Sequence, residues 1–252
     1  MSPPDPLSPD ARPSAAPAAS TGAVKRFGRF QLLRLLGKSA RTMAWLTMDG
    51  RSQAEMVLVM PRQQPQGEAL ERWRQGARRA ARLSHPQLAR AQEIGEHERW
   101  PYVAYDRADT VTWAERFSRQ GIPPEELAQW AMQAASGLAY AHEAGVAHHD
   151  LQPWLVSVDD GGRVRILGLD VGFAPGDAGP PAAMDELRRV RDAAVADVLA
   201  LGILMHHGLA GAPALEQADV ARVMALMPPQ GDRKSTRLNS SHSQQSRMPS
   251  SA

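Results

Sequence analysis

The chain of 252 residues contains no cysteine, which excludes disulfide bonds and thiolate metal sites. No apolar run approaches the roughly 20 residues that span a bilayer, and the longest candidate, Val198–Met205, stops at two histidines. The N-terminus lacks the charged region and apolar core of a secretory signal. These absences predict a chain without a membrane segment and with a cytoplasmic location.

Positive charge is concentrated at the C-terminus. Residues 232–252 hold four Lys/Arg and one acidic residue, a balance of +3, so the net charge of +2 leaves −1 for residues 1–231. A basic surface for nucleic acid is therefore not predicted. The hydrophobic content of 43% is enough to bury a core, so we expect a globular domain.

Both ends of the chain differ from this domain in composition. Residues 1–24 carry six prolines among alanine, serine and aspartate, and we expect this leader to be disordered. Residues 232–252 resemble a translated sequencing-library adapter, with the blocks Asp232–His242 and Ser246–Ala252 on either side of a variable index. We interpret this tail as non-native, which would cut the native sequence near Gly231; an ordinary polar tail is the alternative.

Residues 25–106 are predicted to form a small lobe of five strands and one helix. The strand candidates are short apolar runs separated by turn signals such as Asp49-Gly50. The helix candidate has apolar residues at helical spacing until Ser84-His85-Pro86 ends it. We expect the strands at residues 30–36, 43–46, 56–60, 91–94 and 102–105, and the helix at residues 70–83.

Residues 107–231 are predicted to form a mainly helical lobe. The helix expected at residues 125–142 has one apolar face and begins after two prolines. The loop Ala147–Leu155 and two short strands, at residues 156–158 and 163–167, come next. Further helices are expected at residues 185–195, 197–209 and 215–227. The predicted fold class is α+β with two lobes.

Four short motifs occur in a fixed order along the chain: Leu83–Pro86, Gly137–His142, Gly145–Pro153 and Asp197–Gly202. With these motifs, residues 27–230 resemble the bacterial family of eukaryotic-like serine/threonine protein kinases. The resemblance implies a two-lobed protein-kinase-like fold with an incomplete C-terminal lobe. It also implies ATP- and magnesium-dependent phosphoryl transfer, which depends on a small set of polar residues.

In the N-terminal lobe the chain departs from that set. The family has a glycine-rich loop whose backbone approaches the phosphates. The corresponding segment, Gly37–Thr42, keeps only the first glycine, and Ser39 and Thr42 replace the other glycines. The resemblance places the phosphate-binding lysine at Met60 and its glutamate partner at Gly76. It also places Leu58 where the family has a small residue over the adenine.

In the C-terminal lobe the family's proton-accepting aspartate is kept as Asp150. His149 replaces the arginine before it, and Gln152 replaces the lysine that approaches the transferred phosphate. The two magnesium ligands fall on Leu155 and Gly168, which cannot bind a metal through their side chains. We interpret Asp150 as a structural residue that accepts hydrogen bonds, and Asp197 as the residue that braces this loop.

Three other functional interpretations are weaker. Asp170 could be a displaced metal ligand, although metal sites tolerate little misplacement. Lys38 could supply the missing cation from the glycine loop, but a solvated lysine is commoner. The pairs His148-His149 and His206-His207 could suggest a metal, yet adjacent histidines on a strand-like loop point apart, and no metal site is predicted.

Two functions follow as hypotheses. The first is an inactive pseudokinase that acts as a protein-interaction or regulatory module, with an unknown protein partner and no cofactor. The second is an atypical serine/threonine kinase that uses Asp150 as base, with Gly37 and Lys38 at the nucleotide. Only this alternative requires ATP and magnesium.

Overall fold

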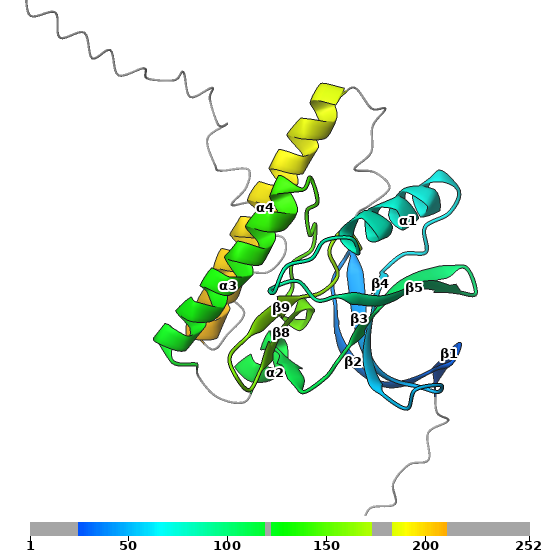
Figure 1. Ribbon diagram of the computed structural model, residues 1–252, viewed down its shortest axis with the longest axis horizontal. Coiled ribbons are helices and arrows are strands. Elements are labelled where there is room, and N and C mark those ends of the chain that lie inside the picture. Colours follow the sequence, from blue (N-terminus) through cyan, green and yellow to red (C-terminus); the bar gives the residue numbers. More distant parts are fainter. Residues whose placement is uncertain (1–24, 119–121, 173–182, 211–252) are drawn as a thin grey trace, which may run out of the picture.

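The computed structural model describes residues 25–118, 122–172 and 183–210, which form a curled β-sheet lobe and a mainly helical lobe (Figure 1). The predicted α+β class with two lobes is confirmed. The leader, the tail and the helix expected at residues 215–227 lie outside the described residues. The division into leader, domain and tail stays a prediction.

The N-terminal lobe is built on a six-stranded antiparallel sheet in the order β1-β2-β3-β4-β6-β5. The five predicted strands are confirmed, and the two-residue β1 adds one edge strand. Helix α1 (Glu68–Ala80) packs on one face of the sheet through Trp73 and Ala77. The strands are β1 (Arg26–Phe27), β2 (Phe30–Lys38), β3 (Thr42–Asp49), β4 (Glu55–Pro61), β5 (Ala91–His97) and β6 (Trp100–Asp106).

The C-terminal lobe combines helices with a small antiparallel sheet, β7-β8-β9. The predicted helix at residues 125–142 and both short strands are confirmed, whereas β7 and α2 were not predicted. The two helices expected around Ala196 form one helix, because this stretch has no proline or glycine to break it. The elements are β7 (Thr110–Thr112), α2 (Trp113–Phe117), α3 (Pro124–Glu143), η1 (Pro153–Leu155), β8 (Val156–Asp159), β9 (Val164–Ile166) and α4 (Ala183–Ala210).

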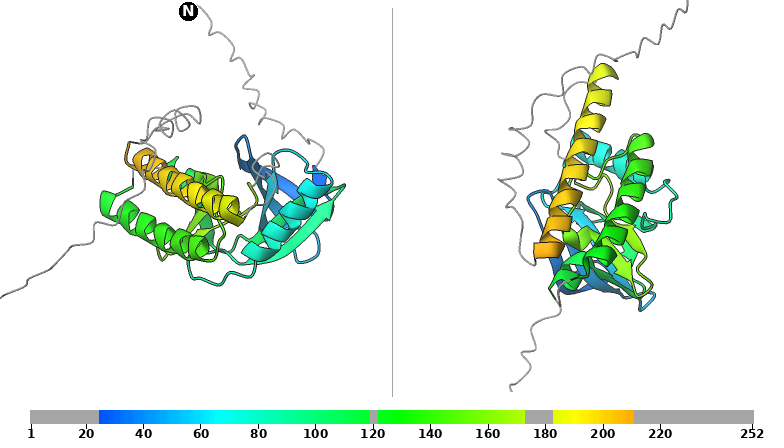
Figure 2. Two further views of the ribbon diagram at one scale, coloured as in Figure 1. Left: turned by 90° about the horizontal axis from the view of Figure 1, so that it is seen from above. Right: turned by 90° about the vertical axis from the view of Figure 1, so that its left-hand side faces the viewer.

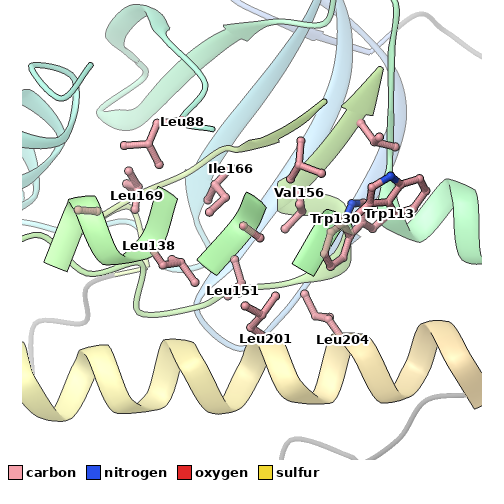
Figure 3. Packing of buried hydrophobic residues seen from close by; sticks show 14 of the residues in the cluster. Leu88, Trp113, Trp130, Leu138, Leu151, Val156, Ile166, Leu169, Leu201 and Leu204 are labelled. Carbon is pink, nitrogen blue, oxygen red and sulfur yellow. The ribbon is translucent and has the colours of Figure 1, made fainter. Parts of the chain in front are cut away.

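Helices α3 and α4 lie side by side in all three views (Figures 1 and 2). Leu201 and Leu204 of α4 point toward the core, where Leu138 of α3 also lies (Figure 3). At one end of this core Trp113 stacks on Trp130, with ring centroids 5.9 Å apart. The loop between α3 and β8 packs on this core through Val146 and Leu151.

By length and composition, residues Arg188–Ala210 of α4 could cross a membrane, whereas the sequence was predicted to contain no membrane segment. The same helix packs against α3 and buries Leu201 and Leu204 in the lobe core. Core helices of globular domains meet the same criteria of length and composition. Packing within the lobe accounts for Leu201 and Leu204, whereas Val198 and Leu209 of the same helix are 61% and 56% exposed.

An ion pair joins the two lobes beside the connecting segment. Glu115 of α2 accepts hydrogen bonds from Arg34 of β2 and from Arg107, whose Nη2 lies 3.1 Å from Oε1. It also completes a capping box with Thr112 at the start of α2. Burial alone would raise the pKa of the Glu115 carboxyl, but hydrogen bonds from Thr112, Arg107 and Arg34 outweigh it and lower the pKa to about 2.

We predict that Glu115→Gln lowers the melting temperature at pH 7. Because the folded-state pKa is depressed, the stabilisation is present above the ordinary value of 4.5 and is lost as the pH falls toward about 2. The difference in melting temperature from the wild type should therefore shrink over that range. The matched control is Glu68→Gln, whose side chain is 92% exposed and should matter little at any pH. A difference that does not change with pH would contradict this assignment.

Candidate functional site

The loop that carries Asp150 is held from below by Asp197 of α4. The buried Asp197 carboxylate accepts hydrogen bonds from the backbone N–H groups of His148 (2.7 Å) and His149 (3.0 Å). His142 of α3 contacts the same carboxylate at 2.9 Å. The predicted bracing role of Asp197 is confirmed.

His148 is fully buried within this loop. Its Nε2 lies 2.8 Å from the carbonyl oxygen of Leu167, to which it donates as a neutral imidazole. Burial lowers the pKa of His148, because a charged ring would lose its hydration. The imidazole therefore ties the loop to the segment that follows β9.

Asp150 is buried, and its carboxylate is engaged by the glycine-loop segment. Oδ2 accepts hydrogen bonds from the hydroxyls of Ser39 and Thr42, each at 2.5 Å. Oδ1 accepts a third from Gln152 at 2.8 Å. The Asp150 side chain therefore connects the two lobes. The backbone of Gly172 also lies close to it, since a Cβ added to Gly172 would lie 2.8 Å from the Cβ of Asp150.

The glycine loop lies directly on Trp154. A β-carbon added to Gly37 would lie 2.1 Å from Cδ2 of the indole, so only glycine fits against this ring. The indole N–H is buried without a hydrogen-bond partner among the described residues. Lys38, at the end of β2, is exposed. Gly37 and Lys38 are thus neighbours in sequence with different surroundings.

The structure corrects the assignment of residues on β4. Leu58 and Met60 pack on one face of the sheet with Phe30, whereas Val57 and Val59 pack on the other face with α1. Side chains alternate along a strand, so Met60 cannot face the cleft between the lobes. Val59 faces it instead, and the positions given to Met60 and Leu58 were wrong by one residue. Because both faces of β4 are buried, its sequence has no alternation that fixes the phase.

Apolar groups meet at the position that the resemblance gives to the magnesium ligands. A β-carbon on Gly168 would lie 3.1 Å from Cγ1 of Val59 and 3.4 Å from Cδ2 of Leu155. Val59 and Leu155 have no measurable exposure. The Gly168 N–H donates to the hydroxyl of Tyr105 at 3.0 Å, and burial raises the pKa of that hydroxyl to about 12. Among the residues that the structure describes, the atoms nearest to this position are all aliphatic carbons.

Asp170 points away from this contact, toward α1. Its carboxylate pairs with Nη2 of Arg79 at 3.0 Å and with Nε2 of His149 at 3.3 Å. It occupies the space beside Gly76, where an added Cβ would lie 2.6 Å from its Oδ2. Burial alone would raise the pKa of Asp170, but His149 and Arg79 outweigh it and keep the pKa below its usual range. Asp170 and Arg79 thus join α1 to the C-terminal lobe.

The backbone around these ion pairs is conformationally unusual. His149 and Asp170 have φ values of 68° and 62°, in the left-handed region that residues other than glycine seldom adopt. Gly168 has a φ of 81°, which glycine adopts without strain. Strained residues of this kind persist where surrounding contacts fix them, as the bonds to Asp197 and Arg79 do here.

Several residues of this site were not foreseen from the sequence. The contacts of Trp154 and Arg79 join segments far apart in the chain and leave no local pattern. Ser39 and Thr42 did give a signal, because two hydroxyl residues replace glycines in a loop that approaches Asp150. Within the described ranges, no three His, Asp or Glu side chains are grouped so that they could hold a metal ion.

Comparisons with known proteins point to one group. PrkC of Bacillus subtilis is 25% identical over 150 residues, which cover 58% of this chain and 23% of that protein. PknI of Mycobacterium tuberculosis is 28% identical over 212 residues, covering 81% of this chain and 35% of that protein. Both are named serine/threonine-protein kinases. No protein-family model matches the chain.

The crystal structure of the PknI kinase domain from M. tuberculosis matches with a TM-score of 0.55 at 22% identity, covering 84% of this chain and 83% of that one. The matched region spans only 20% to 35% of the length of the first curated relatives. Its homologues are thus bacterial serine/threonine kinases, and its fold is protein-kinase-like.

The close approach of Gly76 and Asp170 leads to a prediction. Gly76→Ala should destabilise the domain by about 1–3 kcal/mol, because the new Cβ would displace a buried carboxylate that is held by Arg79 and contacts His149. Gly202→Ala is the matched control, since its Cβ would meet nothing within 4 Å and should stabilise α4 by up to ~1 kcal/mol. Denaturant unfolding of both variants measures the contrast. Stabilisation by both substitutions would refute the tight packing at Gly76.

Proposed function

We propose that this protein-kinase-like domain, related to the bacterial serine/threonine kinases, is a pseudokinase: it transfers no phosphate and acts as a protein-interaction or regulatory module. The observation that carries the proposal is the apolar contact of Val59, Leu155 and Gly168. Phosphoryl transfer requires a cation and oxygen ligands for magnesium at these positions. Side chains without charge or oxygen atoms supply neither.

The residues present do not fit magnesium-bound ATP. Magnesium prefers carboxylate, amide and water oxygens in near-octahedral geometry, and a phosphate chain carries several charges. Burying such charges against Val59 and Leu155 would leave them without compensating groups, which is strongly unfavourable. We therefore propose that the domain functions without ATP or magnesium.

Asp150 supports the same proposal. A general base must reach the proton that it accepts. Here both carboxylate oxygens already accept hydrogen bonds, Oδ2 from Ser39 and Thr42 and Oδ1 from Gln152. We propose that Asp150 holds the glycine loop against the C-terminal lobe, a structural role across the cleft.

Asp170 and Lys38 do not restore the missing groups in this arrangement. The Asp170 carboxylate is paired with Arg79 and also contacts Nε2 of His149, so its oxygens are already engaged. Lys38 is exposed at the end of β2 rather than buried in the cleft. The described contacts of Asp170 and Lys38 therefore do not favour the atypical-kinase hypothesis. That hypothesis is the alternative that the ATP-binding and phosphate-transfer measurements below would detect.

A two-lobed domain whose lobes are joined by direct contacts can present a fixed surface to another protein. The ion pairs at Glu115 and Asp170 and the hydrogen bonds of Asp150 all join the two lobes. We propose that a protein partner recognises this fixed arrangement. A cytoplasmic location and the absence of nucleic-acid binding remain parts of the proposal.

We predict that ATP with magnesium produces no saturable rise in the melting temperature of the full chain. Ligands that bind only the folded state raise it, so an open nucleotide site would be detected. The kinase domain of PrkC is the positive control, with radiolabelled ATP and a generic protein substrate in parallel. Phosphate transfer by this chain that disappears in Asp150→Asn and Lys38→Ala would overturn the proposal in favour of the atypical kinase.

A further inference from the structure

We infer that the space beneath the glycine loop is a slot for a planar aromatic ring, and that the chain fills it with its own Trp154. The inference rests on the proposed function and deepens it, because the indole of Trp154 would occupy space between the lobes that a bound nucleotide would require. In these terms Trp154 is an internal ligand that keeps the two lobes in contact.

The slot is shaped for a flat group. Atoms Cδ2, Cε3 and Cγ of the Trp154 indole would lie 2.1, 2.4 and 2.6 Å from a β-carbon on Gly37. These are adjacent atoms of one ring system, so the backbone of β2 at Gly37 lies directly against the indole. A side chain at position 37 would be excluded, because an aromatic ring packed against a core cannot move aside as a flexible chain end can.

The far side of the slot is formed by an apolar cluster that we call the interlobe cluster. It includes residues of both lobes, and Trp154 and Leu36 pack against it. The buried members are Ala44, Val57, Val59, Trp73, Ala77, Val103, Tyr105, Leu155, Leu167 and Val171. Trp154 itself is half-buried, so removing the indole would open a recess between the lobes that has apolar walls and is accessible from solvent.

The position of Trp154 in the chain fixes the ring in place. It is the middle residue of η1, between Pro153 and Leu155, which are both buried. Proline restricts the backbone before it, and Leu155 anchors the segment after it in the interlobe cluster. The hydrogen bonds of Ser39 and Thr42 to Asp150 close the loop over the ring from the other end. The indole is thus held from two sides.

The polar edge of the Trp154 ring makes no contribution to its binding, as is also the case for Trp113 in the core of the C-terminal lobe. Buried tryptophan N–H groups usually find an acceptor. That of Trp154 is buried without one among the described residues. The contacts that hold the ring are those of its carbon atoms with Gly37 and the interlobe cluster, so the ligand class that follows is a planar bicyclic aromatic, for which indole is the direct probe.

The first test is rescue of a cavity in the full chain. Trp154→Gly should lower the melting temperature, and free indole should raise that of the variant in a saturable manner while leaving the wild type unchanged. Cyclohexanol, which is apolar but not planar, is the matched ligand control and should rescue poorly. A variant that indole does not stabilise, or that cyclohexanol stabilises equally, would overturn the inference.

The second test is a double-mutant cycle that needs no ligand. Gly37→Ala should lower the melting temperature of the wild type, since its Cβ would collide with the indole. The same substitution should have little effect when Trp154 is glycine, or leucine if the glycine variant does not fold. Additive effects would refute the contact. These readouts are independent of phosphate transfer, so failure here and failure of the proposed function are distinguishable.

Discussion

The interlobe cluster is the constraint on which the rest of the structure depends. An apolar interior excludes water, and it disfavours any charge that is not paired within it. At Val59, Leu155 and Gly168 this interior occupies the position where phosphoryl transfer would need hydrated, charged groups. The same contacts that stabilise the two lobes against each other are therefore the ones on which the proposed loss of phosphoryl transfer depends.

The carboxylates near the cleft follow from this constraint, because each must be compensated locally. Asp150 accepts hydrogen bonds from hydroxyls of the glycine loop, Asp170 is paired with Arg79, and Asp197 accepts hydrogen bonds from backbone N–H groups. In each case the partner comes from a different part of the chain. The polar groups of this site thus act as connectors between elements.

Local patterns predicted most of the fold, since strands, turns and helices are specified by residues close in sequence. The same patterns could not place the side chains of β4, because a strand buried on both faces carries no alternation. Nor could they find the contact of Trp154 with Gly37 or the pairing of Asp170 with Arg79, which depend on how distant segments meet. Asp150 could be located from its motif, but its hydrogen bonds to Ser39 and Thr42 could not.

The bond between Ser39 and Asp150 joins residues 111 positions apart, and that from Trp73 to the carbonyl of Val171 spans 98. Closing loops of this length costs chain entropy before any contact compensates for it. Each lobe has nearer contacts that can form first, within its own sheet or helices. The contacts between the lobes would then form last during folding. The hydrogen bonds from the glycine loop to Asp150 would form only after both lobes have folded.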